Sequence, residues 1–231
     1  MNTERKTLPA GADPDDGQRA RADVYRLLAA LLAGPADQTL LKLLRNLESE
    51  ASAGTAMNSA WQALRTAAEN AAAKDIEQEY FNLFIGLGRG ELVPYASWYV
   101  HGLLMEKLLA SLRDELAVLG LERRDGVSEP EDHVAALCET MGMIIGDSEL
   151  CLKEVAFFET YLDPWMGRFF VDLEKAETAV FYKAVGRLGH ARGSCHDCHR
   201  LGRNRRRGSG RNRRNGRSLQ TGKRAEQLDA D

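Results

Sequence analysis

The 231-residue chain has no long apolar run and only four cysteines. No stretch approaches the roughly 18 apolar residues that a membrane-spanning helix needs, so we expect no membrane insertion. The N-terminal sequence MNTERKTLPAGADPDD is polar and acidic, without the apolar segment of a secretory signal, which predicts a cytoplasmic protein. In that compartment four cysteines stay reduced, which excludes a disulfide-stapled fold.

The sequence also has little net charge, −3, but its charges are distributed unevenly. From Arg187 to the end, 12 Arg and one Lys stand against four acidic residues, a balance of +9. The remaining 186 residues therefore carry −12. An acidic body of this kind favours cationic ligands and repels nucleic acid, whereas the basic tail would do the opposite.

No alternating strand pattern and no Asn-Gly hairpin signal occurs in the body of the chain. Apolar residues recur instead at helical spacing, as in Val24, Leu27, Leu28 and Leu31, and Gly34-Pro35 ends that helix. Similar patterns repeat as far as Leu188. The sequence predicts an all-α fold, a single globular helical domain of about nine helices with disordered termini.

Three helix starts are predicted from capping signals. Asp75 with Gln78 three residues later, and Ser128-Glu129-Pro130-Glu131, have the pattern of a capping box. Asp163-Pro164 has the pattern of an N-cap followed by a first-turn proline. We also expect Gly86 to end a helix, because the glycines at 86, 88 and 90 follow a helix rather than a strand and so do not form a phosphate-binding loop.

The composition divides the chain into three parts. Residues 1–18 are rich in Pro, Gly and Asp without periodicity and are predicted to be disordered. Residues 19–188 carry the helical patterns and form the predicted domain. Residues 189–231 include RNRRRGSGRNRRNGR and are predicted to be a disordered, low-complexity basic tail.

A candidate binding site comes from two segments far apart in the sequence. The first, 94–99 (PYASWY), supplies rigid and aromatic apolar surface, and the second, 129–133 (EPEDH), supplies carboxylates at an expected helix start. Carboxylates accept the guanidinium fork through two hydrogen bonds, so such a site suits a peptide with arginines beside apolar residues. Asp132 and His133, as sequence neighbours at a helix start, point apart and are poorly placed for acid–base catalysis, so no enzyme is expected.

These residues resemble a known family. The combination of EYFNLFIG (79–86), PYASWY (94–99) and EPEDHVAALCETM (129–141) resembles the TorD/DmsD-type redox-enzyme maturation chaperones. The resemblance covers roughly residues 19–188 and includes the Leu162–Trp165 turn. It implies an all-helical cytoplasmic chaperone rather than an enzyme, with no cofactor of its own.

The resemblance also implies the partner. Such a chaperone binds the twin-arginine signal peptide and the apo form of a molybdopterin oxidoreductase, formate dehydrogenase-like or DMSO/TMAO reductase-like, and holds it for cofactor insertion before export. Family members exchange helices to form homodimers, which leaves the oligomeric state open. The signal-peptide-binding residues implied here are Leu83, Phe84, Pro94, Ser97, Trp98, Tyr99, Glu129, Pro130, Asp132 and His133.

The C-terminal segment, from about Gly189 onward, departs from the family pattern. A shifted reading frame would produce such a change. The segment contains Cys195, Cys198 and His199 in a C-x-x-C-H arrangement, which matches haem attachment and, as a less favoured alternative, a metal site. We expect neither, because the motif lies beside low-complexity sequence and no second ligand pair follows. The main alternative function is nucleic-acid binding through the Arg-rich tail, but the tail has no aromatic residue for base stacking.

Overall fold

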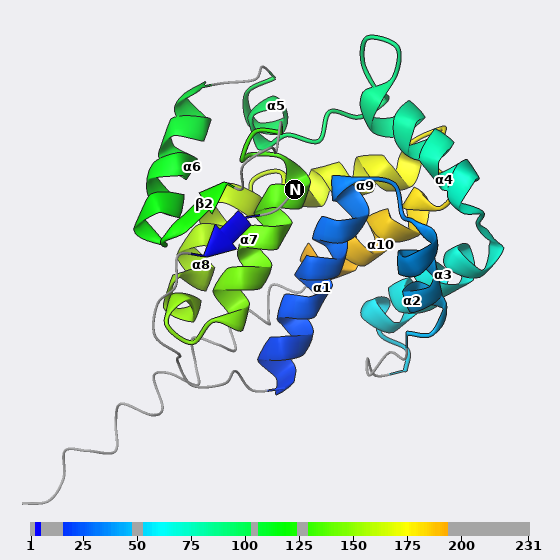
Figure 1. Cartoon of the computed structure of the whole chain (residues 1–231), viewed down its shortest axis with the longest axis horizontal. Helices are drawn as coiled ribbons and strands as arrows, with labels where there is room; N and C mark the ends of the chain where they lie inside the picture. Colours follow the sequence, from blue (N-terminus) through cyan, green and yellow to red (C-terminus); the bar gives the residue numbers. More distant parts are fainter. Residues whose placement is uncertain (1–2, 6–15, 48–52, 103–105, 124–128, 194–231) are drawn as a thin grey trace, which may run out of the picture. The chain divides into compact units, whose positions relative to one another are not determined.

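The structure is a computed structural model that describes residues 3–5, 16–47, 53–102, 106–123 and 129–193. These residues contain ten α-helices, three short segments of other helix types and two short strands, so the all-α prediction is confirmed (Figure 1). The elements are β1 (Thr3–Arg5), α1 (Asp16–Ala33), α2 (Gln38–Arg45), α3 (Ala56–Asn70), α4 (Ala73–Tyr80), η1 (Phe81–Ile85), α5 (Ala96–His101), α6 (Glu106–Val118), β2 (Leu121–Arg123), α7 (Val134–Gly146), η2 (Leu150–Lys153), α8 (Glu154–Phe157), η3 (Phe158–Leu162), α9 (Met166–Lys175) and α10 (Tyr182–Gly193).

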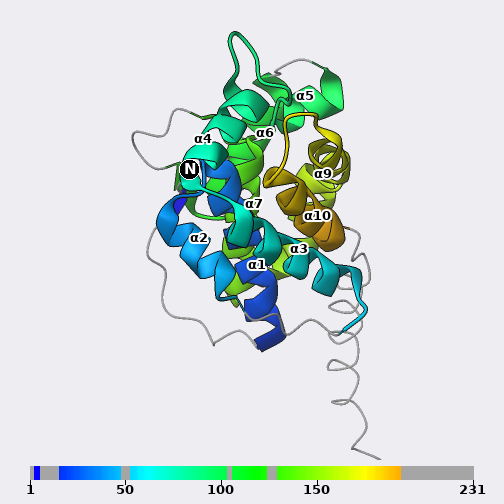
Figure 2. The same ribbon diagram turned by 90° about the vertical axis from the view of Figure 1, so that its right-hand side faces the viewer.

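The core of the described chain is built mainly by three helix pairings. α1 packs along α7, where a Cβ on Gly142 would lie 3.0 Å from the Cγ atom of Arg26 and 3.2 Å from the carbonyl oxygen of Ala22. The missing side chain therefore lets the two helices approach closely. α10 packs against both α9 and α3, and Figure 2 shows α3 alongside α10. α7 is buried nearly all round, which makes it the central helix of the described chain.

The ends of the helical region lie slightly outside the predicted domain of residues 19–188. α1 begins at Asp16 and α10 ends at Gly193. Most of the segments predicted to be disordered lie outside the described residues, so their disorder stays a prediction.

Two short strands are present that the sequence did not predict. β1 and β2 pair antiparallel, with Thr3 opposite Arg123, Glu4 opposite Glu122 and Arg5 opposite Leu121. A three-residue strand is too short to show the alternating pattern by which strands are recognised, which is why the sequence signal failed.

The three predicted helix starts are wrong by several residues. α4 begins at Ala73, so Asp75 lies within its first turn and caps nothing at its own N-terminus. α7 begins at Val134 with His133 as its N-cap, and Ser128 lies outside the described residues. α9 begins at Met166, after a turn that contains Asp163. Gly86, in contrast, ends η1 with a positive φ of 60°, as predicted.

Glu79 satisfies the backbone N–H groups at the start of a distant helix. Its nearly buried carboxylate accepts hydrogen bonds from the backbone N–H groups of Val180 (2.8 Å), Phe181 (3.0 Å) and Tyr182 (2.8 Å). These groups belong to the start of α10, whose first N–H groups have no partner within the helix. A side chain of α4 therefore caps a helix that begins about 100 residues later.

Glu91 holds the turn just before α10 in the same way. Its carboxylate accepts from the backbone N–H of Glu177 (2.5 Å) and from the backbone N–H (3.1 Å) and hydroxyl (2.6 Å) of Thr178. Partial burial opposes ionisation, but these hydrogen bonds lower the pKa of Glu91 below its usual value. Glu79 and Glu91, which lie 12 residues apart in the sequence, thus both bind the connection between α9 and α10.

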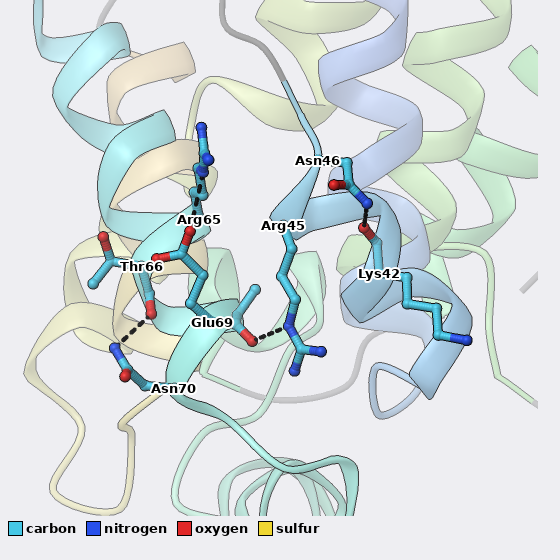
Figure 3. Close-up of polar contacts among 8 residues, drawn as sticks. Lys42, Arg45, Asn46, Arg65, Thr66, Glu69 and Asn70 are labelled. Atoms are coloured by element: carbon cyan, nitrogen blue, oxygen red, sulfur yellow. Dashed lines mark hydrogen bonds and ion pairs between the residues drawn. The ribbon is translucent and has the colours of Figure 1, made fainter.

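A helix C-terminus is held by a cation in a corresponding way. Arg45 of α2 donates to the carbonyl oxygens of Ala68 (Nε, 2.8 Å) and Ala71 (Nη2, 3.1 Å) at the end of α3, and Figure 3 shows this side chain crossing from α2 to α3. The positive charge meets the negative end of the helix dipole. Arg65 and Glu69 form an ion pair along the exposed side of α3 (3.1 Å).

We predict that Glu79→Gln lowers the free energy of unfolding by about 2 kcal/mol, because the amide turns an N–H group toward a backbone donor and removes the charge. Urea unfolding followed by circular dichroism measures the loss. Glu77→Gln, an exposed position on the same helix, is the matched control and should change stability by less than about 0.5 kcal/mol. Equal effects in the two variants would contradict the capping role.

Candidate functional site

The two candidate segments meet in space. Tyr95 and His133 form an isolated antiparallel bridge, and the backbone N–H of Val134 donates to the carbonyl of Pro94 (2.8 Å). The N–H of Ala96 donates to the carbonyl of Asp132 (3.0 Å). The bridge keeps His133 extended (φ −63°, ψ 139°), and α7 can begin only after it. The residues of the turn 129–133 therefore precede the helix instead of forming its first turn.

Asp132 has a structural role within this junction. It is fully buried, and its Oδ2 atom accepts from the backbone N–H (3.0 Å) and the hydroxyl (2.6 Å) of Ser97, which is also fully buried. Ser97 lies at the start of α5, whose own N-cap residue Tyr95 makes no capping hydrogen bond. Asp132 thus caps α5 from a distant segment, so it positions α5 and has no surface for a ligand.

His133 is neutral in this environment. Its Nδ1 atom accepts from the backbone N–H of Ala135 (3.2 Å) and caps α7, and its ring packs edge-on against Tyr95 with centroids 5.1 Å apart. Burial lowers the pKa of His133 to about 4, although the carboxylate of Glu129 acts in the opposite direction. His133 therefore does not supply positive charge near neutral pH.

Glu129 keeps part of its surface. Its carboxylate accepts a hydrogen bond from the Tyr95 hydroxyl, and burial together with this hydrogen bond raises the pKa of Tyr95. Burial, followed by the charge of Glu129, also raises the pKa of Tyr80 to about 12. The charge of Glu129 therefore acts on Tyr80 of α4 as well as on Tyr95. The sequence analysis missed Tyr80, although it lies within EYFNLFIG.

Glu131 differs from Glu129 because it is already paired. Its carboxylate lies 2.9 Å from Nη2 of Arg113 and 3.9 Å from Nε of Arg123. Burial opposes ionisation, but the hydrogen bond from Arg113 and the charges of both arginines lower the pKa of Glu131 below its usual value. Pro130 is half-buried between the two glutamates.

The aromatic residues of α5 are half-buried and each lies beside an arginine. The guanidinium of Arg89 lies 5.3 Å from the ring centroid of Trp98, and that of Arg168 lies 5.8 Å from the ring of Tyr99. The Tyr99 ring also packs against Trp165, with centroids 5.5 Å apart, which ties α5 to the start of α9. Pro94, two residues before α5, is buried.

Leu83 and Phe84 belong to a neighbouring cluster. Leu83 is fully buried, and Phe84 packs its ring 5.0 Å from Tyr80 and 5.6 Å from Tyr182 of α10. Tyr80 belongs to this cluster, and its ring lies 5.8 Å from that of Tyr182. Of the ten predicted site residues, those with some exposed surface are Phe84, Trp98, Tyr99, Glu129 and Pro130.

Other candidate features contribute little to this site. Cys195, Cys198 and His199 lie outside the described residues. Among the described residues, no group of three or more His, Cys, Asp or Glu side chains converges as metal ligands would. In the described part of the chain, no helix combines the length and apolar character needed to cross a membrane.

Comparison with known proteins identifies the class. The nitrate reductase delta subunit family matches residues 50–171, and the chain belongs to this family. The resemblance to TorD/DmsD-type maturation chaperones is confirmed by relatives named chaperone protein TorD. That of Shewanella loihica is 26% identical over 209 residues, covering 82% of this chain and 97% of the relative. That of Psychrobacter is 27% identical over 193 residues, covering 74% and 87%.

The fold has a solved counterpart. A crystal structure titled as a redox enzyme maturation protein from Archaeoglobus fulgidus superposes with a TM-score of 0.52. The superposition covers 80% of this chain and 97% of that one, at 17% sequence identity. At this identity the likeness concerns the fold.

We predict that His133→Asn flattens the pH dependence of stability between pH 6.5 and 4. In the wild type the unfolded chain binds a proton near pH 6.5 and the folded chain only near pH 4. The free energy of unfolding therefore decreases as the pH is lowered from 6.5 to 4, by up to about 3 kcal/mol. Asparagine retains an acceptor for capping but does not titrate.

Chemical unfolding at a series of pH values measures this effect. His101→Asn, an exposed histidine at the end of α5, is the control and should keep the wild-type slope. An unchanged slope in His133→Asn would show that His133 is not the group responsible.

Proposed function

We propose that this protein is a cytoplasmic chaperone that matures a molybdopterin-dependent oxidoreductase and is not itself an enzyme. It binds the twin-arginine signal peptide of its client, formate dehydrogenase-like or DMSO/TMAO reductase-like, and holds the apo-enzyme for cofactor insertion before export. The names of its relatives, chaperone protein TorD, support the chaperone role. No cofactor of its own is needed for this role.

The observation that carries the peptide-binding proposal is the junction between segments 94–99 and 129–133. It brings a half-exposed carboxylate, Glu129, beside the aromatic surface of Tyr95 and α5. The other two carboxylates of the turn already have partners within the chain. Asp132 accepts a hydrogen bond from Ser97, and Glu131 forms ion pairs with two arginines. Glu129 is therefore the residue of this turn best suited to receive a guanidinium group from the client.

The apolar part of the leader would meet the half-buried rings of Phe84, Trp98 and Tyr99. Burial of apolar side chains there supplies affinity, and the carboxylate supplies selectivity for arginine. The acidic body, at −12 over residues 1–186, attracts a basic peptide over longer distances, so binding weakens as salt rises. Buried Asp132, His133, Ser97 and Pro94 act by positioning these groups.

We predict that Glu129→Gln weakens binding of a synthetic twin-arginine leader peptide about tenfold, the loss expected for one charge-assisted hydrogen bond. The glutamine can still accept from Tyr95, so the junction is retained. Isothermal titration calorimetry measures the affinity, and circular dichroism verifies the fold.

Asp114→Asn, which removes one exposed carboxylate from α6, is the charge-matched control and should bind like the wild type. A peptide in which both arginines are replaced by glutamine should bind the wild type and Glu129→Gln equally weakly. Unchanged affinity of Glu129→Gln for the arginine peptide would contradict this site, and failure of the wild type to bind it would contradict the proposed function.

A further inference from the structure

An arginine of the chain itself occupies part of the aromatic surface of the candidate site. Arg89 lies in the loop 86–90 between η1 and α5, and its Cζ atom is 5.3 Å from the ring centroid of Trp98 on α5. Arg89 is exposed and Trp98 is half-buried. Such a contact is attractive because the face of the indole ring is electron-rich, and at exposed sites it changes a binding equilibrium by about two- to fivefold. The ring of Trp98 is therefore a surface that binds a guanidinium group.

The contact with Trp98 is what holds the guanidinium of Arg89. Within the described residues this group forms no hydrogen bond and no ion pair. The loop that carries it protrudes between η1 and α5 (Figure 1), and Leu87 in the same loop is 98% exposed. The base of the loop is fixed by its backbone, since the N–H of Gly86 donates to the carbonyl of Phe81 (2.7 Å). The Arg89 side chain can therefore leave the ring without breaking a described polar contact.

The second arginine–aromatic pair on α5 is held more firmly. The ring of Tyr99 packs against Trp165, with centroids 5.5 Å apart. The guanidinium of Arg168, beside Tyr99, also has an acidic neighbour, because its Nε atom lies 3.9 Å from Oδ2 of Asp172. Of the two pairs, the one formed by Arg89 is therefore the easier to exchange for a guanidinium from another chain.

Trp98 lies one helical turn from the residue that binds Glu129. Tyr95 donates its hydroxyl proton to Glu129 and precedes Trp98 by three residues, a spacing at which side chains are neighbours across a helical turn. The two groups differ in what they recognise. A carboxylate attracts arginine and lysine alike, whereas an aromatic face favours the planar guanidinium, which is less strongly hydrated than an ammonium group. The ring therefore adds a preference for arginine over lysine.

We propose that the ring face of Trp98 is a second guanidinium subsite, which binds one arginine of the client's leader while Glu129 binds the other, and that Arg89 occupies this subsite in the free chaperone. The inference rests on the proposed function and extends it, because it assigns a guanidinium to Trp98 rather than the apolar part of the leader. Two adjacent arginines then meet two groups of different chemistry, and Arg89 is a competitor that only another guanidinium replaces well.

The first test removes the ring. Trp98→Leu keeps an apolar side chain, so it retains apolar contacts but not the attraction for a cation. Synthetic leader peptides with Arg-Arg, Arg-Lys or Lys-Arg are titrated by calorimetry. We expect the wild type to bind the Arg-Arg peptide about threefold more tightly than at least one lysine peptide, and Trp98→Leu to bind all three nearly equally.

A matched control makes the same substitution elsewhere. Trp61→Leu changes a half-buried tryptophan of α3 and should keep the arginine preference of the wild type. Circular dichroism verifies that both variants are folded.

The second test removes the competitor. Arg89→Gln should bind the Arg-Arg peptide about threefold more tightly, because the ring is free in a larger fraction of the molecules. Loss of any positive charge also favours a cationic peptide, and Lys107→Gln, at an exposed position of α6, measures that contribution alone. When Trp98 is already leucine, Arg89→Gln should have no more effect than Lys107→Gln.

Three results would overturn the inference: no preference for arginine in the wild type, an unchanged preference in Trp98→Leu, or an effect of Arg89→Gln that is the same with and without the ring. In each case the proposed function stands as long as the Arg-Arg peptide binds and Glu129→Gln weakens that binding. If the wild type binds no leader peptide, both proposals fail.

Discussion

Buried or partly buried side chains that bind the helix ends of distant segments hold this fold together. Glu79 binds the start of α10, Asp132 binds the start of α5, and Arg45 binds the end of α3. Each contact satisfies backbone groups that a helix cannot satisfy itself, and each joins opposite charges, since the helix dipole is positive at its N-terminus and negative at its C-terminus. An uncapped buried helix end would be costly, so these contacts fix where α5 and α10 begin.

This constraint changes the meaning of the acidic residues in the family motifs. Glu79 and Asp132 are buried and accept hydrogen bonds from the backbone N–H groups of distant segments, so they set the geometry of the surface without forming part of it. Glu131 is neutralised by two arginines. Of the three carboxylates on the turn 129–133, the one that keeps exposed surface without an arginine partner is that of Glu129.

The junction of the two candidate segments depends on backbone pairing more than on side chains. The bridge between Tyr95 and His133 and the hydrogen bonds of Pro94 and Asp132 tie a loop after η1 to a turn before α7. α7 is almost entirely buried, so the core fixes the position of the turn 129–133 that directly precedes this helix. The aromatic residues of α5 then pack onto α9 through Tyr99 and Trp165. The candidate site is therefore continuous with the core.

Sequence patterns located most helices because a helix is a local structure. The spacing of Val24, Leu27, Leu28 and Leu31 follows the 3.6-residue period, and Gly86 marks an end because few other residues adopt its positive φ. The starts of α4, α7 and α9 were misplaced because local capping signals compete with tertiary contacts. At Asp75 no capping bond forms, and the extended bridge at His133 delays α7 until Val134.

The amino-acid sequence by itself determined the helical class of this protein, its acidic body, and the two segments that would form a site, because periodicity, charge and motif residues are local properties. Only the tertiary structure decided which carboxylate of the second segment keeps a surface and which are used inside the molecule. That distinction depends on burial and on partners more than 30 residues away in the chain, such as Ser97 for Asp132. The pairing of Thr3–Arg5 with β2 likewise joins segments whose local sequence contains no strand signal.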